Sequence, residues 1–184
     1  MATSYALLLF CNLTFFAFLA SITIGSSFVA TDSELVERIC NQTAPYYKFC
    51  KDVLNSDPRT PGADGATLAY VAFELANRNA SSTQDQITLL LSNSTGLLHQ
   101  HLEQCHLDYA TAIVKTFLAL TDLDQKTYGR LTYGRLTYFA SMTGEQAKDC
   151  ESAFDGTKSP LANNNNDLYG LSVICVALAK WLNV

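Results

Sequence analysis

Apolar residues recur at every third or fourth position along most of this chain, and this helical period limits the fold more than any other feature. The cleanest stripe covers residues 98–120 and includes Cys105, Tyr109 and Phe117. No segment alternates apolar and polar residues as a half-exposed β-strand would. The pattern therefore predicts an all-α protein in which four long helices form an up-down bundle. The other stripes cover residues 68–76 and 87–91, with a polar break at 79–86, then about 126–155, and 167–183.

Two shorter helices are expected before the bundle. Residues 33–41 carry one apolar stripe, and Pro45 stands at a plausible first turn of a second short helix that ends near Leu54. The segment that follows, NSDPRTPGADG, is rich in turn-forming residues and is expected to connect this helical pair to the bundle. The asparagine tract 163–166 is expected to act as a linker and cap before the last helix.

The first 30 residues contain no charged side chain, and residues 5–24 form an almost unbroken apolar run followed by GSSFVA. This order is typical of a secretory signal peptide, cleaved between residues 26 and 30. The alternative is a membrane anchor, because the run approaches the ~20 residues that span a bilayer. Polar residues dilute the run, however, and no basic cluster follows it. We therefore expect a signal peptide at 1–30, one domain at 31–184, and a secreted, extracellular protein.

The charge of the chain argues against several classes of partner. All charged residues lie after position 31, and the net charge is −5. Without a basic stripe or a Lys/Arg-rich cluster, the mature chain has no electrostatic basis for binding nucleic acid or an anionic membrane. The sequence also lacks the G-x-S-x-G, H-E-x-x-H, P-loop and Rossmann motifs. We expect neither an enzyme nor a cofactor.

The cysteines suggest a disulfide framework, since an oxidising compartment would leave two bridges and one spare thiol. Cys40 and Cys50 are ten residues apart and would join the two short helices. Cys105 and Cys150 lie in the apolar stripes of two long helices and would tie these together. Loop-entropy estimates predict that the two bridges stabilise the folded state by ~3 and ~4 kcal/mol, respectively. After Cys11 in the leader, the chain contains Cys40, Cys50, Cys105, Cys150 and Cys175.

Three N-glycosylation sequons agree with secretion and begin at Asn41, Asn79 and Asn93. A metal site was considered at the cluster of His99, His101, Cys105 and His106, because residues four apart share a helix face. The cluster is better explained as helix surface plus one disulfide cysteine, since a closed zinc site needs four such ligands. We expect no metal.

The pentapeptide TYGRL occurs twice in immediate succession within residues 127–136. Five residues turn a helix by ~500°, a net rotation of ~140°, so such an insertion is tolerated only near a helix end. The apolar stripe from Leu136 to Cys150 is in phase with the second copy. The surplus residues 128–132 are therefore expected to extend the N-terminal end of the third long helix or its loop. The alternative is a binding motif, because exposed Tyr and Arg often anchor interfaces.

Several segments together resemble the plant invertase/pectin methylesterase inhibitor family over essentially the whole mature chain. They are ICNQTAPYYKFCKDVLNSDPR, the C-x3-Y-x2-A of Cys105–Ala112, and LTYFASMTGEQAKDCESAF. The resemblance implies a four-helix bundle with an N-terminal α-helical hairpin. It also implies disulfides Cys40–Cys50 and Cys105–Cys150 and a free thiol at Cys175.

By this resemblance the chain is a monomeric, non-enzymatic inhibitor of a cell-wall carbohydrate-active enzyme, which covers the substrate cleft in a stoichiometric complex. Pectin methylesterase is the favoured target, because the loop entering the third long helix lacks the Pro-Lys-Phe of invertase-directed relatives. Acid invertase is the alternative, and a non-inhibitory wall or pollen protein of the same fold is another. The expected target-binding surface comprises Asp108, Thr111, Tyr128, Arg130 and Glu151.

Overall fold

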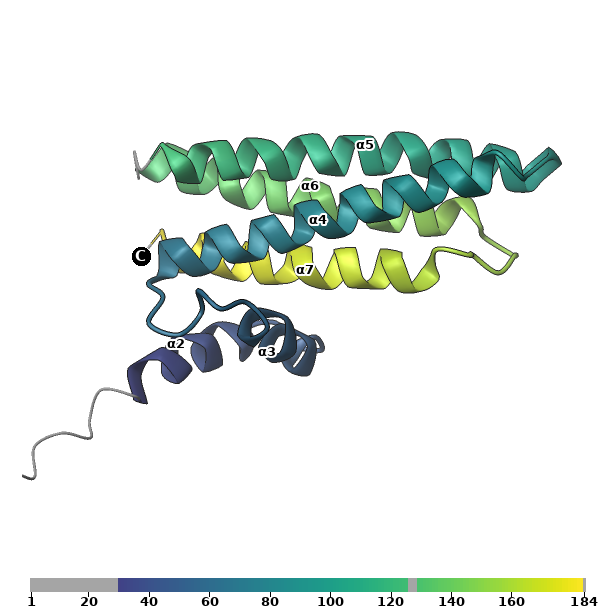
Figure 1. Ribbon diagram of the computed structural model, residues 1–184. Coiled ribbons are helices and arrows are strands. Elements are labelled where there is room, and N and C mark those ends of the chain that lie inside the picture. The colour runs from purple at the N-terminus through teal and green to yellow at the C-terminus, as the bar shows by residue number, and fades with distance from the viewer. Residues whose placement is uncertain (1–29, 126–128, 184) are drawn as a thin grey trace, which may run out of the picture.

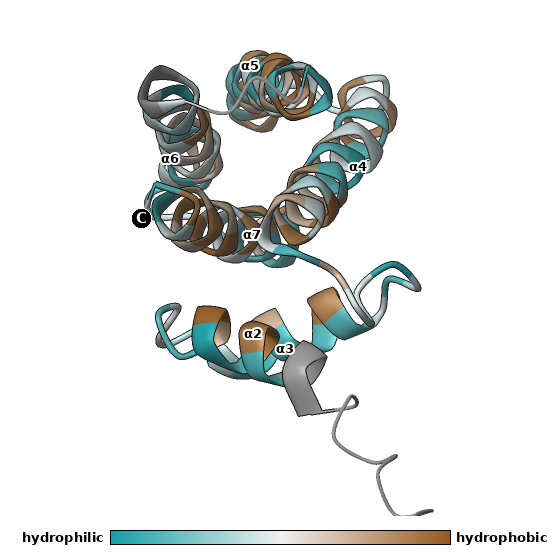
Figure 2. Cartoon of the chain, turned by 90° about the vertical axis from the view of Figure 1, so that its left-hand side faces the viewer, coloured by the Kyte–Doolittle hydropathy of each residue, from teal (hydrophilic) through white to brown (hydrophobic). Residues whose placement is uncertain are grey.

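The computed structural model describes residues 30–125 and 129–183, and both ranges are helical, with no strand in either. The four longer helices each pack against the next, and the last packs against the first, so they close a bundle (Figures 1 and 2). The predicted all-α bundle is confirmed. The expected signal peptide, residues 1–30, lies outside the described ranges except for Ala30, which begins the first described helix. The helices are α2 (Ala30–Cys40), α3 (Tyr47–Asn55), α4 (Gly65–Leu91), α5 (Gly96–Asp124), α6 (Arg130–Ala153) and α7 (Ala162–Trp181).

Helix α4 is continuous through the polar break at 79–86. It begins after Asp64, whose carboxylate accepts a hydrogen bond from the Thr67 backbone N–H and caps the helix. Inside the polar segment, Ala80 and Thr83 remain buried. The Thr83 hydroxyl donates to the backbone carbonyl of Asn79, four residues earlier, at 2.9 Å. The buried face therefore persists through a stretch that is polar on its other sides.

Two helix starts differ from those expected. Pro45 precedes α3 by two residues instead of opening it. Helix α7 begins at Ala162, so the asparagine tract 163–166 forms its first turns and is not a linker. The tract is helical because one of its side chains packs inside the bundle. Asn165 is 3% exposed and forms hydrogen bonds with side chains of α5 and α6.

Helices α2 and α3 form a hairpin on the outside of α7 (Figure 2). The disulfide Cys40–Cys50 closes the hairpin, and Lys51 pairs with Glu37 across it at 2.8 Å. The ring of Tyr46 packs edge-on against Tyr169, with ring centroids 5.8 Å apart. A β-carbon at Gly170 would lie 2.8 Å from the Tyr46 ring, so only glycine lets the hairpin approach α7 this closely. The predicted N-terminal hairpin is thus present and docked.

A second disulfide, Cys105–Cys150, joins α5 to α6 in the core, with the two Cα atoms 4.5 Å apart. The remaining described cysteine, Cys175, is unpaired and buried on α7. Burial raises the pKa of the Cys175 thiol well above its usual value. The disulfide framework implied by the resemblance is therefore formed.

The second TYGRL copy belongs to the packed part of α6. Leu136 is fully buried, and the guanidinium of Arg135 lies 3.0 Å from the carboxylate of Asp122 at the end of α5. Asp122 is itself buried, with 6% of its surface exposed. Helix α6 begins at Arg130, so part of the first copy makes its first turn, while residues 126–128 lie outside the described ranges.

Candidate protein-binding surface

Large apolar side chains project into solvent along the outer side of α5. Leu107, Val114 and Phe117 are 64%, 53% and 63% exposed. Residues seven and three apart lie on one side of a helix, so these three side chains form a single stripe. Exposed apolar groups gathered in one place are typical of protein-binding surfaces.

Helix α6 extends this surface with Tyr138, which is 52% exposed. The ammonium group of Lys115 lies 5.5 Å from the centroid of the Tyr138 ring, a cation–π arrangement that links the two helices. Lys115 is the single charged residue between positions 109 and 121. We call the surface formed by Leu107, Thr111, Val114, Phe117 and Tyr138 the α5 face.

Of the residues expected to bind the target, Thr111 belongs to the α5 face. It lies four residues after Leu107 and three before Val114, and its hydroxyl donates to the backbone carbonyl of Leu107 at 3.0 Å. Its hydroxyl is therefore held against the helix backbone. Tyr128 lies outside the described residues, as does the side chain of Arg130.

Asp108 is a correction to the expected surface, because it is only 5% exposed. Its Oδ1 accepts a hydrogen bond from the amide of Gln104 at 2.9 Å, while the buried Oδ2 has no partner. Burial raises the pKa of this carboxyl, and the hydrogen bond from Gln104 opposes the shift.

Glu151 is exposed on α6. Its Oε2 accepts a hydrogen bond from the side-chain amide of Asn165 on α7 at 2.6 Å. Its carboxylate is thus directed towards α7 and contributes to the α6–α7 contact. Glu151 therefore has its hydrogen-bond partner on α7, whereas Thr111 lies on α5.

The sequence analysis missed Leu107, Val114 and Tyr138, and it assigned Phe117 to the core stripe. Phe117 follows the buried Thr116 directly, so the stripe alone did not distinguish their directions. A usable signal existed, because Leu107 and Val114 are spaced by seven residues and fall between core positions. Uncharged residues at those positions indicate a second apolar side of the helix.

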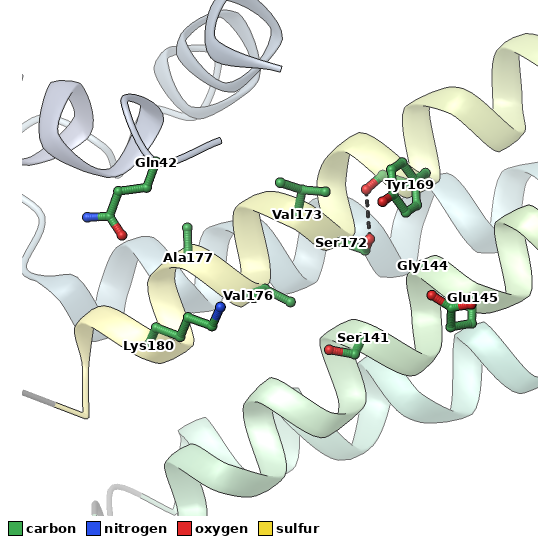
Figure 3. Close-up of a pocket in the computed structure, with 10 residues that line it drawn as sticks. All are labelled: Gln42, Ser141, Gly144, Glu145, Tyr169, Ser172, Val173, Val176, Ala177 and Lys180. Carbon is green, nitrogen blue, oxygen red and sulfur yellow. Dashed lines mark hydrogen bonds between the residues drawn. The ribbon is translucent and has the colours of Figure 1, made fainter. Parts of the chain in front are cut away.

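A separate shallow groove of about 310 Å³ lies between α6 and α7, with Gln42 of the hairpin turn at one end (Figure 3). Val173, Val176 and Ala177 line its apolar part, and Glu145 and Lys180 carry its charges. None of the buried unpartnered polar atoms of the described residues belongs to this groove. We interpret it as the groove left where α6, α7 and the hairpin pack together.

Two members of the His–Cys cluster make other contacts in the fold. Cys105 is disulfide-bonded, and the His101 ring packs edge-on against Phe154, with centroids 5.2 Å apart. Within residues 30–125 and 129–183, no group of three or more His, Cys, Asp or Glu side chains is arranged to hold a metal ion. None of the helices in these ranges is long and apolar enough to cross a membrane.

Comparison with known proteins agrees with this architecture. The family model described as plant invertase/pectin methylesterase inhibitor matches residues 34–178. The chain is 36% identical over 130 residues to the cell wall / vacuolar inhibitor of fructosidase 2 of Arabidopsis thaliana, covering 70% of this chain and 69% of that protein. It is 29% identical over 129 residues to the pectinesterase inhibitor of Actinidia deliciosa, covering 70% and 66%.

The crystal structure of a pectin methylesterase inhibitor from Arabidopsis thaliana has the same fold, with a TM-score of 0.61. The match covers 83% of this chain and 98% of that one, at 18% sequence identity. At such low identity, this match supports the fold alone. The family model, in contrast, matches most of the chain. The chain belongs to the plant invertase/pectin methylesterase inhibitor family, whose members are inhibitors and not enzymes.

Proposed function

We propose that this chain inhibits a cell-wall or vacuolar β-fructosidase, that is, an acid invertase, by covering its substrate cleft in a one-to-one complex. The observation that carries the proposal is the α5 face, an exposed apolar surface on a protein whose family acts by inhibiting enzymes. The mechanism needs no catalytic group, because an inhibitor that occludes a cleft works by binding alone.

The α5 face has the properties expected for the centre of a protein interface. On α5 the face extends from Leu107 to Phe117, over ~15 Å of helix at 1.5 Å per residue. Charged residues are depleted and aromatic residues enriched at interface cores, and this face offers the exposed aromatic rings of Phe117 and Tyr138, with Lys115 beside Tyr138. The cation–π contact restrains the Tyr138 ring, so less side-chain freedom is lost when a partner binds.

The choice of invertase rests on the relatives. The Arabidopsis protein at 36% identity is named for fructosidase inhibition, whereas the Actinidia pectinesterase inhibitor is 29% identical over a similar length. This order reverses the expectation drawn from the missing Pro-Lys-Phe motif. Pectin methylesterase remains the second candidate because that motif is absent from residues 121–131.

Titration of the purified protein against acid invertase and against pectin methylesterase tests the proposal. We expect loss of invertase activity with an end point at one inhibitor per enzyme and no effect on pectin methylesterase. Inhibition of pectin methylesterase alone would reverse the assignment. Inhibition of neither enzyme would favour a non-inhibitory binding protein of the same fold.

Two matched variants test the surface. Val114→Glu places a charge in the middle of the α5 face and should weaken inhibition at least tenfold, about 1.4 kcal/mol. Leu89→Glu is the control, because Leu89 is also exposed but lies near the C-terminal end of α4. Equal inhibition by wild type and Val114→Glu would show that another surface contacts the enzyme.

A further inference from the structure

Three leucines are exposed where α4 meets α5. Leu89 and Leu97 are each 69% exposed, and Leu98 is 45% exposed. They flank the turn 92–95, which lies at the end of the bundle opposite the C-terminus (Figure 1). We call Leu89, Leu97 and Leu98 the leucine tip. Exposure of three large apolar side chains around one turn is costly in water, so a cover for them would be favourable.

The turn contains a residue that can carry such a cover. Asn93 is exposed, lies midway between Leu89 and Leu97, and begins the sequon Asn-Ser-Thr. Its amide Nδ2 donates to the Leu89 carbonyl and to Ser92 Oγ, each at 3.0 Å. A glycosylated asparagine keeps one of its two amide hydrogens, so one of these bonds survives attachment. The third residue of the sequon is Thr95, which precedes α5, and its side chain makes no capping hydrogen bond to that helix.

We propose that Asn93 carries an N-linked oligosaccharide and that this glycan covers the leucine tip. The donor is a lipid diphosphate-linked oligosaccharide of the secretory pathway. A bond forms between Nδ2 of Asn93 and the anomeric carbon, while the bond from that carbon to the diphosphate oxygen breaks. The amide loses one proton, the lipid diphosphate leaves, and no oxidation state changes.

The sequon at Asn79 is a poorer site in the folded protein. Asn79 lies in the middle of α4, is partly buried, and its Oδ1 is enclosed by protein. It borders a groove of about 340 Å³ that Phe49 of α3 and Leu171 of α7 also line, so a glycan there would push the hairpin away from the bundle. Asn41 directly follows Cys40 of the hairpin disulfide.

Mass spectrometry tests occupancy. The full chain, secreted from a eukaryotic host, is digested, and the peptide that contains Asn93 is analysed alongside the intact protein. We expect an oligosaccharide on this peptide, and we expect Asn93→Gln to lower the intact mass by one glycan. Asn79→Gln is the matched control and should leave the glycan mass unchanged. An unmodified Asn93 in the secreted wild-type protein would overturn the proposal.

Dye binding tests whether the glycan covers the leucine tip. An apolar fluorescent dye such as ANS reports exposed hydrophobic surface, and we expect it to bind secreted Asn93→Gln at least twice as strongly as wild type. Adding Leu89→Ser and Leu97→Ser to Asn93→Gln should abolish the increase. Adding Leu107→Ser, on the α5 face, should not. Equal dye binding by wild type and Asn93→Gln would refute the cover, and none of these measurements involves a target enzyme.

Discussion

The hydroxyl of Tyr109 donates a hydrogen bond to Oδ1 of Asn165 at 2.8 Å and thereby joins α5 to α7 inside the bundle. Both residues are buried. The amide of Asn165 donates in turn to Glu151 on α6 at 2.6 Å, so a single asparagine links three helices. Burial also raises the pKa of the Tyr109 hydroxyl far above neutrality, which keeps it protonated as the donor.

We expect Tyr109→Phe to lower the free energy of unfolding by about 1–2 kcal/mol, because the buried Oδ1 of Asn165 loses its donor. Urea unfolding followed by circular dichroism measures the change. Tyr138→Phe is the control, since its ring is exposed and its stability should stay within about 0.5 kcal/mol of wild type. Equal stabilities for Tyr109→Phe and wild type would mean that water or another group replaces the bond.

The hydrogen bond between Tyr109 and Asn165 also explains why the prediction of a linker at residues 163–166 was wrong. Asparagine favours turns because its side chain bonds to nearby backbone, so four in succession indicate a linker. In the fold, Asn165 finds partners on α5 and α6, and Asn164 donates to Thr83 on α4 at 3.2 Å. Tertiary hydrogen bonds thus outweigh the local preference, and a single-segment pattern cannot anticipate them.

The bundle itself could be predicted, because its core is built from the helical period that the sequence displays. Residues such as Leu102, Cys105 and Tyr109 are buried as their spacing indicates. The surface was harder, since Asp108 and Phe117 were both assigned to the wrong side of α5. A charged residue is expected outside and an aromatic one inside, but in the fold Asp108 is 5% exposed and Phe117 is 63% exposed.

The tandem TYGRL segment leads to a second prediction. Deleting residues 128–132 leaves one copy and shortens the segment between Asp124 and Arg135 from ten residues to five, a common length for a helix connection. Arg135 can then keep its ion pair with Asp122, and Leu136 its buried position. We expect the melting midpoint to fall by less than ~5 °C, corresponding to roughly 1 kcal/mol.

Deleting five residues inside α6 should behave differently. Removal of residues 140–144 rotates the rest of the helix by ~140° and carries Cys150 away from Cys105. A free-thiol count should give one thiol for the first deletion and three for the second. More than one thiol after deletion of 128–132 would place that segment in the packed core.

A third prediction concerns acid stability. Both carboxylate oxygens of Asp57 accept hydrogen bonds from the Arg59 guanidinium, at 2.8 and 2.7 Å, and these bonds lower the Asp57 pKa to about 2. Because the folded pKa lies below the unfolded value of ~3.9, this stabilisation is present above about pH 4. It is lost as the pH falls through about 2.

At pH 5, Asp57→Asn should therefore lower the free energy of unfolding by about 1 kcal/mol relative to wild type. At pH 2 the difference between the two proteins should be smaller. Urea unfolding at both pH values measures it. Asp52→Asn is the control, since its ion pair with Lys48 is largely exposed and should contribute little at either pH. A difference between Asp57→Asn and wild type that grows towards pH 2 would contradict the sign of the shift.

The fourth prediction concerns Cys175, which is 1% exposed on α7 and has no disulfide partner. Thiol reagents attack the thiolate, and burial both raises the thiol pKa and excludes the reagent. We expect no labelling of the native protein at pH 8 over hours and complete labelling of one thiol in denaturant. Mass spectrometry after a maleimide reaction measures both. Cys175→Ala should remove the labelling but retain the native circular dichroism spectrum, because the thiol forms no cross-link. Rapid labelling of the native protein, at a rate independent of added urea, would mean that α7 opens locally, and Cys175 would then not belong to the stable core.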